Sequence, residues 1–258
     1  MIDFSRRINL RLMSIFALLF ASAFAVYGDE GMWTFDNPPL ARIEKTYGVK
    51  LSKEWLDHLR LSSVRLNDGG SASFVSANGL ILTNHHVAEG CIGRLSSEKN
   101  DYSKNGYGTD GVLPEVPCPG TEANILVGYE NVTARVLGSV PKDATDIAAA
   151  DARKAEIAVI EKSCTESTGL RCDVVRLYEG GEYWLYRYEK YKDVRLVFAP
   201  ETSVAQYGGD PDNFNYPRHD LDFTLLRAYG KDGKPAHTAN FLKWDLQAFE
   251  WVNFIEFG

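Results

Sequence analysis

Three features are missing from this 258-residue sequence, and each absence excludes a class of protein. Basic residues are not in excess: 28 lysines and arginines stand against 35 aspartates and glutamates, for a formal net charge of −7. Since phosphate binding needs a basic surface, we expect no nucleic-acid partner. No apolar run reaches the roughly 20 residues that span a bilayer. The four cysteines form no C-x2-C pair, which argues against a structural zinc site.

The first residues have the form of a secretory leader. Three arginines precede an apolar run at 12–26 that only two serines interrupt. A basic start, a short apolar core and a small-residue exit are typical of signal peptides. We therefore predict that residues 1–28 are cleaved, that the mature chain begins near Asp29, and that no stable membrane span remains. An uncleaved N-terminal anchor is the alternative.

Export makes the cysteines candidates for disulfide bonds. Cys91, Cys118, Cys164 and Cys172 allow three pairings. We favour the sequence-local pairing, Cys91 with Cys118 and Cys164 with Cys172, because each pair brackets a loop rich in small, polar or charged residues. A zinc site built from all four cysteines is the alternative. No cofactor and no other metal site is predicted.

The hydrophobic pattern predicts a mainly β domain over residues 29–240 with a helical insertion at about 143–165. Residues 38–59 have a helical period that Gly48 divides into two short helices. Asn78-Gly79 is the strongest hairpin signal and joins predicted strands at 71–75 and 79–83. The remaining prediction is a long loop at 92–120, an Ala-rich helix at 145–163, a loop at 208–217, and strands at 125–127, 132–140, 173–178, 182–191, 194–198 and 222–229.

A histidine pair stands where the second strand of this hairpin ends. In chymotrypsin-fold enzymes the general base lies in such a place, and an aspartate follows later in the chain to accept its Nδ1 proton. Asp222, at the head of an apolar run, fits that aspartate, and Asp220 on the same strand face is the rival. Adjacent residues on a strand point to opposite sides, so only one of His85 and His86 can face the cleft.

The segment Thr83-Asn-His-His-Val87 resembles the Thr-Asn-Asn-His-Val of trypsin-like periplasmic proteases, which aligns His86 with their base and leaves His85 as a support or surface residue. Several separated blocks also resemble the bacterial dipeptidyl-peptidase 7 and 11 family, in the right order. They are residues 29–33, 84–86, 192–200, 208–213 and 216–219. The resemblance implies a chymotrypsin-like double β-barrel, with the first barrel present and the second only begun at 241–258.

The same resemblance implies a serine exopeptidase that releases N-terminal dipeptides. His86 resembles the family's general base and Asp222 its orienting acid. Asn213 resembles the residue that grips the substrate's free α-amino group, with Phe214 where many relatives have Trp. From these residues alone, Asn213 would be an Asx-turn in a Gly/Pro loop. We expect peptide substrates with a free N-terminus and a periplasmic or cell-surface location in a Gram-negative bacterium. Homodimerisation of the full-length parent is expected only from the resemblance.

The sequence contains no Gly-x-Ser-Gly stretch for a nucleophile. Ser71 follows two glycines but precedes the histidines, so we interpret it as structural. The resemblance puts the nucleophilic serine and the residues that select acidic or hydrophobic side chains beyond residue 258. We therefore expect this chain to be inactive alone. The alternative is a non-catalytic trypsin-fold remnant or a peptide-binding module.

Overall fold

The computed structural model describes residues 33–35, 37–67, 69–109, 114–209 and 218–243, and divides the chain into two compact units, Met1–Lys50 and Leu51–Gly258. The described part of the first unit contains helix α2 (Leu40–Tyr47), which ends at Gly48 in the left-handed conformation with φ 68°. Glycine adopts this conformation at little cost. The second unit begins with α3 (Lys53–Ser62), so two short helices flank Gly48 as predicted. The predicted leader lies outside the described residues, and the helices that are described are each too short or too polar to cross a membrane.

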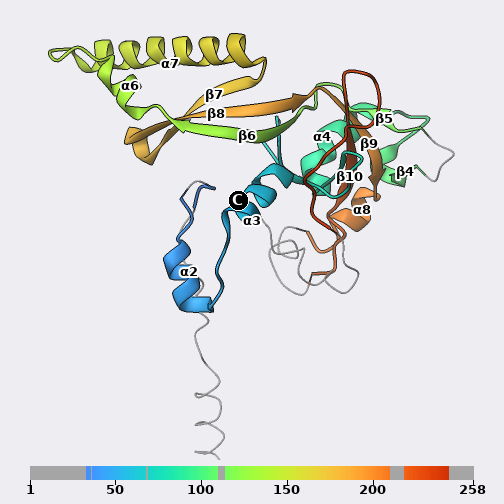
Figure 1. Cartoon of the computed structure of the whole chain (residues 1–258). Coiled ribbons are helices and arrows are strands. Elements are labelled where there is room, and N and C mark those ends of the chain that lie inside the picture. The colour runs from blue at the N-terminus through green and yellow to red at the C-terminus, as the bar shows by residue number, and fades with distance from the viewer. Residues whose placement is uncertain (1–32, 36, 68, 110–113, 210–217, 244–258) are drawn as a thin grey trace, which may run out of the picture. The chain divides into compact units, whose positions relative to one another are not determined.

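The second unit is built on one 10-stranded antiparallel sheet (Figure 1). The strands follow the order β4-β9-β10-β3-β2-β1-β6-β8-β7, and β5 also pairs with β9. Their bounds are β1 (Ser63–Leu66), β2 (Ser71–Phe74), β3 (Leu80–Thr83), β4 (Tyr107–Gly108), β5 (Val116–Pro117), β6 (Ala123–Asn131), β7 (Arg171–Leu177), β8 (Glu182–Tyr191), β9 (Asp193–Ala199) and β10 (Thr224–Tyr229).

The predicted β2–β3 hairpin is present and turns at Gly79, whose φ is 66°. A Cβ atom there would lie 2.9 Å from the carbonyl oxygen of Ala228, so the position excludes any side chain. β3 then ends at Thr83, and helix α4 (His85–Leu95) follows after a single residue. The hairpin thus delivers the start of α4 to the end of an interior strand, which lies between β2 and β10.

We call the described residues within 63–127 and 188–229 the barrel. Its buried apolar side chains come from strands on both sides of β3 and from α4, and form one cluster that includes Val64, Leu66, Phe74, Ile81, Ile92, Val194, Leu196 and Leu226. The short helices α5 (Tyr102–Asn105) and α8 (Thr202–Ala205) pack against α4. The disulfide Cys91–Cys118 fastens the middle of α4 to the same cluster.

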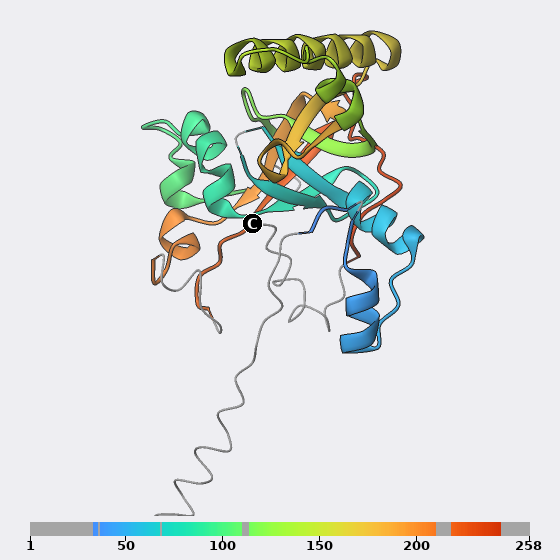
Figure 2. The same ribbon diagram turned by 90° about the vertical axis from the view of Figure 1, so that its left-hand side faces the viewer.

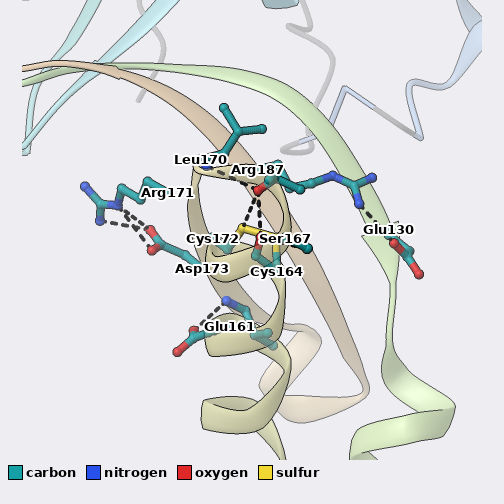
Figure 3. The surroundings of a disulfide bond; sticks show 11 residues. Glu130, Glu161, Cys164, Ser167, Leu170, Arg171, Cys172, Asp173 and Arg187 are labelled. Atoms are coloured by element: carbon teal, nitrogen blue, oxygen red, sulfur yellow. Dashed lines mark hydrogen bonds and ion pairs between the residues drawn. A yellow bond between two sulfur atoms is a disulfide. The ribbon is translucent and has the colours of Figure 1, made fainter.

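We call residues 128–187 the arm. It contains α6 (Thr133–Gly138), α7 (Asp146–Thr168), β7, a 3-10 turn at Tyr178–Gly180 and the distal parts of β6 and β8, and α7 lies along the β7–β8 hairpin in both views (Figures 1 and 2). A second apolar cluster, which includes Val136, Ile160, Tyr183 and Leu185, fills the space between them. The disulfide Cys164–Cys172 joins the end of α7 to β7, and Glu161 one turn earlier accepts the Val174 N–H at 2.7 Å (Figure 3). The predicted Ala-rich helix therefore exists and continues to Thr168.

Two predictions about secondary structure were wrong. Residues 132–140 contain helix α6 in place of a strand, because Val136 is turned into the arm cluster against α7 and is 0% exposed. The predicted loop at 92–120 contains the end of α4, then α5, β4 and β5. Here the disulfide and burial of Ile92 hold a glycine-containing stretch in a helix that local propensity does not favour.

Candidate active site

Both histidines lie in the first turn of α4, directly after the end of β3, so the argument from opposite faces of an extended strand does not apply to them. Successive helical residues point about 100° apart, and that angle is enough to separate their environments. His85 is turned into the core and is 0% exposed, whereas the side chain of His86 is 51% exposed. His85 is thus a supporting residue of the interior and not a surface residue.

The structure brings His86 and Asp222 together. Nδ1 of His86 lies 2.7 Å from Oδ2 of Asp222, and the backbone N–H of His86 donates to Oδ1 of the same carboxylate at 3.1 Å. The side-chain amide of Asn84 donates to Oδ2 at 3.1 Å. The Asp222 side chain is only 6% exposed, so three donors surround a carboxylate that is largely removed from water.

Asp222 also serves as the N-terminal cap of α4. Asn84 occupies the N-cap position but makes no side-chain capping bond, and the carboxylate of Asp222 accepts the free backbone N–H in its place. A helix N-terminus carries partial positive charge, which favours an anion at this position. The cap therefore fixes the carboxylate and the imidazole with respect to one another through both backbone and side chain.

This arrangement determines which ring nitrogen of His86 is free. An ionised carboxylate can only accept hydrogen bonds, so Nδ1 donates its proton to Asp222. Nε2 then carries the lone pair on the half-exposed side of the ring. An imidazole in this tautomer, beside a carboxylate that stabilises its protonated form, is able to act as a general base.

Neighbouring strands of the sheet support His86 and Asp222. Thr83, directly before Asn84, is paired across the strands with Thr224, two residues after Asp222. The ring of Phe223 stacks on Phe198 of β9 at 5.3 Å between centroids. On the other side, a Cβ atom at Gly70 would lie 2.0 Å from a methyl group of Val87, so the chain next to α4 approaches it without a side chain between them.

The other predicted site residues fall into three groups. Asp220, the rival carboxylate, is 7% exposed, and the ion pair with His86 is made by Asp222. Asn213 and Phe214 lie outside the described residues. The four cysteines form Cys91–Cys118 and Cys164–Cys172, the pairing favoured from the sequence.

Sequence reasoning missed the capping role of Asp222 and the burial of His85. An asparagine before two histidines could have indicated a helix N-terminus, because asparagine favours that position. The burial of His85 follows from the helical turn, which no local signal announced. Burial lowers the pKa of His85, and the nearby negative charge of Asp222 opposes that shift only in part.

A hollow of about 370 Å³ lies away from this pair, in the arm between α6, α7 and β8.

The fold and the site define a chymotrypsin-like, mainly β chain that forms part of a barrel and carries a histidine–aspartate pair. More particularly, the chain belongs to the Peptidase S46 family, whose model matches residues 28–255. It is 34% identical over 239 residues to a dipeptidyl-peptidase 7 of Capnocytophaga gingivalis, which covers 90% of this chain and 33% of the relative. It is 36% identical over 233 residues to an Asp/Glu-specific dipeptidyl-peptidase of Shewanella putrefaciens, covering 88% of this chain and 31% of the relative.

Solved structures agree with this assignment. The crystal structure of Porphyromonas endodontalis DPP11 in complex with the dipeptide Arg-Glu matches with a TM-score of 0.70 and 28% identity, over 85% of this chain and 35% of that one. The family resemblance and the fold class predicted from the sequence are thus confirmed. The chain spans about a third of the length of the relatives it matches.

Proposed function

We propose that this chain supplies the general base and its orienting acid to a serine-type dipeptidyl-peptidase. The observation that carries the proposal is the two-point contact of His86 with Asp222, at 2.7 Å through the ring and 3.1 Å through the backbone. Membership of the Peptidase S46 family supports a peptidase. The names of the relatives, dipeptidyl-peptidase 7 and Asp/Glu-specific dipeptidyl-peptidase, support the release of dipeptides.

In the proposed reaction, Nε2 of His86 takes the proton of a serine hydroxyl that comes from outside these 258 residues. The serine oxygen bonds to the peptide carbonyl carbon, and the carbonyl electrons move to its oxygen. When they return, the C–N bond breaks and His86 gives its proton to the leaving amine, which leaves an acyl-enzyme. Water then repeats the sequence and frees the acid. Asp222 holds the Nδ1 proton and stabilises the imidazolium in each half.

The proposed substrates are peptides with a free N-terminus. Asn213 is proposed to bind the α-amino group, since an amide oxygen is a suitable acceptor for an ammonium donor. Phe214 is proposed to form an aromatic wall beside it. Holding that group two residues before the scissile bond would restrict release to dipeptides. The relatives include enzymes named with and without acidic specificity, so no preference for the penultimate side chain is proposed.

The test joins this chain to the C-terminal part of the Capnocytophaga gingivalis relative and follows hydrolysis of dipeptidyl-naphthylamides. Given activity in that chimera, His86→Ala is expected to lower kcat by about 10⁶-fold and Asp222→Asn by about 10⁴-fold, the sizes seen for such changes in other serine peptidases. His85→Ala is expected to retain measurable activity. The reverse order of the two histidine variants would assign the base to His85.

The unjoined chain provides the control. We expect it neither to cleave these substrates nor to react with a fluorophosphonate that labels activated serines. Labelling would show that it carries its own nucleophile and would refute that part of the proposal. Tight binding of peptides without cleavage, in the chimera as well as in the chain, would favour a peptide-binding module.

A further inference from the structure

Asp222 lies just outside the strand that follows it. β10 begins at Thr224, and the last pair of the β3–β10 ladder joins Thr224 to Thr83, so strand pairing does not fix the position of Asp222. Within the described residues, its carboxylate binds two side chains, those of His86 and Asn84. Because the contact with His86 is the one that needs to be held, Asn84 is the candidate for the residue that holds it.

The side-chain amide of Asn84 contacts Asp222 at two points. Its Nδ2 atom lies 3.1 Å from the carboxylate Oδ2 of Asp222 and 3.4 Å from the backbone carbonyl oxygen of the same residue. An ionised carboxylate only accepts hydrogen bonds, so the NH₂ end of the amide faces it. Since one amide group reaches both the backbone and the side chain of Asp222, it favours a single side-chain rotamer of that residue.

Asn84 makes this contact in place of the one that its position in the helix favours. An asparagine at the N-cap normally accepts a backbone N–H of the first turn. Asn84 is the N-cap of α4 but makes no such bond, and the N–H of His86 donates to Oδ1 of Asp222 instead, at 3.1 Å. The cap of the helix is thus transferred to Asp222, and the amide of Asn84 is left to bind the carboxylate that replaces it.

We propose that Asn84 is a positioning residue: its side-chain amide holds Asp222 in the rotamer that accepts the Nδ1 proton of His86, and it thereby sets the tautomer of the proposed base. The inference rests on the His86–Asp222 pair of the proposed function, but not on hydrolysis. Without the amide, the donors that remain on the carboxylate in the described chain both belong to His86, whose side chain is half exposed. The carboxylate and the ring are then free to turn away from one another.

Serine at position 84 separates positioning from helix capping. Serine ranks with asparagine as an N-cap residue, but its side chain is too short to replace the amide nitrogen at Asp222. Asn67→Ser is the matched control. The amide of Asn67 donates to the Gly120 carbonyl at 2.8 Å and accepts the Glu122 N–H at 2.6 Å, so it also joins distant segments of the barrel, through atoms that belong to neither residue of the pair.

The test uses the full chain with ¹⁵N-labelled histidine. Two-bond ¹H–¹⁵N spectra report which ring nitrogen of His86 is protonated, and His86→Gln assigns its signals. The wild type is expected to hold His86 mainly as the Nδ1–H tautomer, and Asp222→Asn is expected to abolish that preference. Asn84→Ser is expected to lower the ratio of the Nδ1–H to the Nε2–H tautomer about threefold or more, with a melting temperature close to that of the wild type. Asn67→Ser is expected to lower the melting temperature and keep the ratio.

A wild-type ratio in Asn84→Ser would overturn the inference and leave the proposed function intact. An equal decrease in Asn67→Ser would trace the effect to general loosening of the barrel and would overturn it as well. No tautomer preference in the wild type itself would refute both the inference and the proposed pair.

If Asn84→Ser does not fold, the wild type labelled with ¹⁵N-asparagine decides. The side-chain amide protons of Asn84 must then exchange with water more slowly than those of an exposed asparagine such as Asn100. Equal exchange rates would mean that the amide does not hold the carboxylate, and would overturn the inference.

Discussion

The barrel and the arm are two ends of one sheet, and each has its own apolar cluster and its own disulfide. They differ in how well their polar groups are paired. Beside His86 and Asp222 in the barrel, buried atoms of His85 and Thr224 have no hydrogen-bond partner among the described residues. In the arm, Thr168 donates to the Cys164 carbonyl at 2.7 Å, and Thr133 accepts the Tyr183 N–H at 2.8 Å.

This difference indicates a division of roles. Buried polar groups without partners are costly, and they tend to be retained where chemistry requires them. The barrel carries that cost next to the proposed base, while the well-paired arm adds stability without touching the site. Changes in the barrel should therefore affect both stability and the His86–Asp222 contact, whereas changes in the arm should affect stability alone.

The largest expected effect comes from removing each disulfide. Cys91–Cys118 closes 27 residues and Cys164–Cys172 closes 8. The loop-entropy model predicts that replacing each pair with alanine lowers the free energy of unfolding by about 3.5 and about 2.5 kcal/mol, respectively. Guanidinium denaturation measures both losses and shows whether the barrel disulfide contributes more than the arm disulfide.

The same two variants sharpen the comparison through the site. Loss of the barrel disulfide frees the middle of α4, so the Nδ1–H tautomer of His86 should decrease only in that variant. An equal decrease on loss of the arm disulfide would contradict the division between the two regions.

A smaller effect is expected at Gly70. Gly70→Ala places a Cβ atom 2.0 Å from a methyl group of Val87, so one of the two segments must move. The free energy of unfolding should fall by about 1–3 kcal/mol, as for other overpacked sites.

Gly93→Ala is the matched control, because nothing lies within 4 Å of a Cβ atom at that position of α4. Alanine is the better helix former by about 0.8–1 kcal/mol, so this variant should be neutral or more stable in urea denaturation. Similar losses in both variants would mean that the close approach of Gly70 to Val87 is not the cause of the loss in Gly70→Ala.

The smallest effect is expected for an ion pair of the arm. Nε of Arg135 lies 2.6 Å from a carboxylate oxygen of Glu156 on α7, and the Arg135 side chain is half exposed. Arg135→Ala should lower the free energy of unfolding by about 0.2–1 kcal/mol, with less effect at high salt.

Lys162→Ala is its control, since Lys162 lies 3.9 Å from Glu166 and both side chains are largely exposed. It should change the unfolding midpoint less than Arg135→Ala does. A larger change for Lys162 would show that α7 contributes through its own charge pattern and not through its contact with α6.

Local patterns predicted those elements whose determinants are local. The turn at Gly79 needs positive φ, which glycine adopts readily. The Ala-rich α7 is capped by Thr145 and Gly169. The determinants of both elements therefore lie within short stretches of sequence. By contrast, residues 132–140 look like a strand because their apolar residues alternate. They form a helix because Val136 packs against α7, a contact between segments that no short window contains.

The site likewise has features that local sequence predicts and features that depend on distant contacts. Chain order and the apolar run after Asp222 predicted the partner of a histidine, and family resemblance selected His86. The separate prediction that only one histidine can face the cleft, because neighbours on a strand point to opposite sides, had a wrong premise, since the strand has already ended at Thr83. The cap formed by Asp222 joins residues that are distant in sequence, so it becomes visible only in three dimensions.

The segment between β6 and β8 begins and ends at neighbouring positions, because Asn131 on β6 is paired with Trp184 on β8, and its strand β7 extends the sheet beyond β8. The whole excursion between them thus occupies the place of a hairpin loop. An insertion at such a point can grow, shrink or be exchanged during evolution without shifting the strands that enclose it. Variation in length among related genes is accordingly best tolerated here, and a two-residue turn between Asn131 and Trp184 would give the shortest version of this domain.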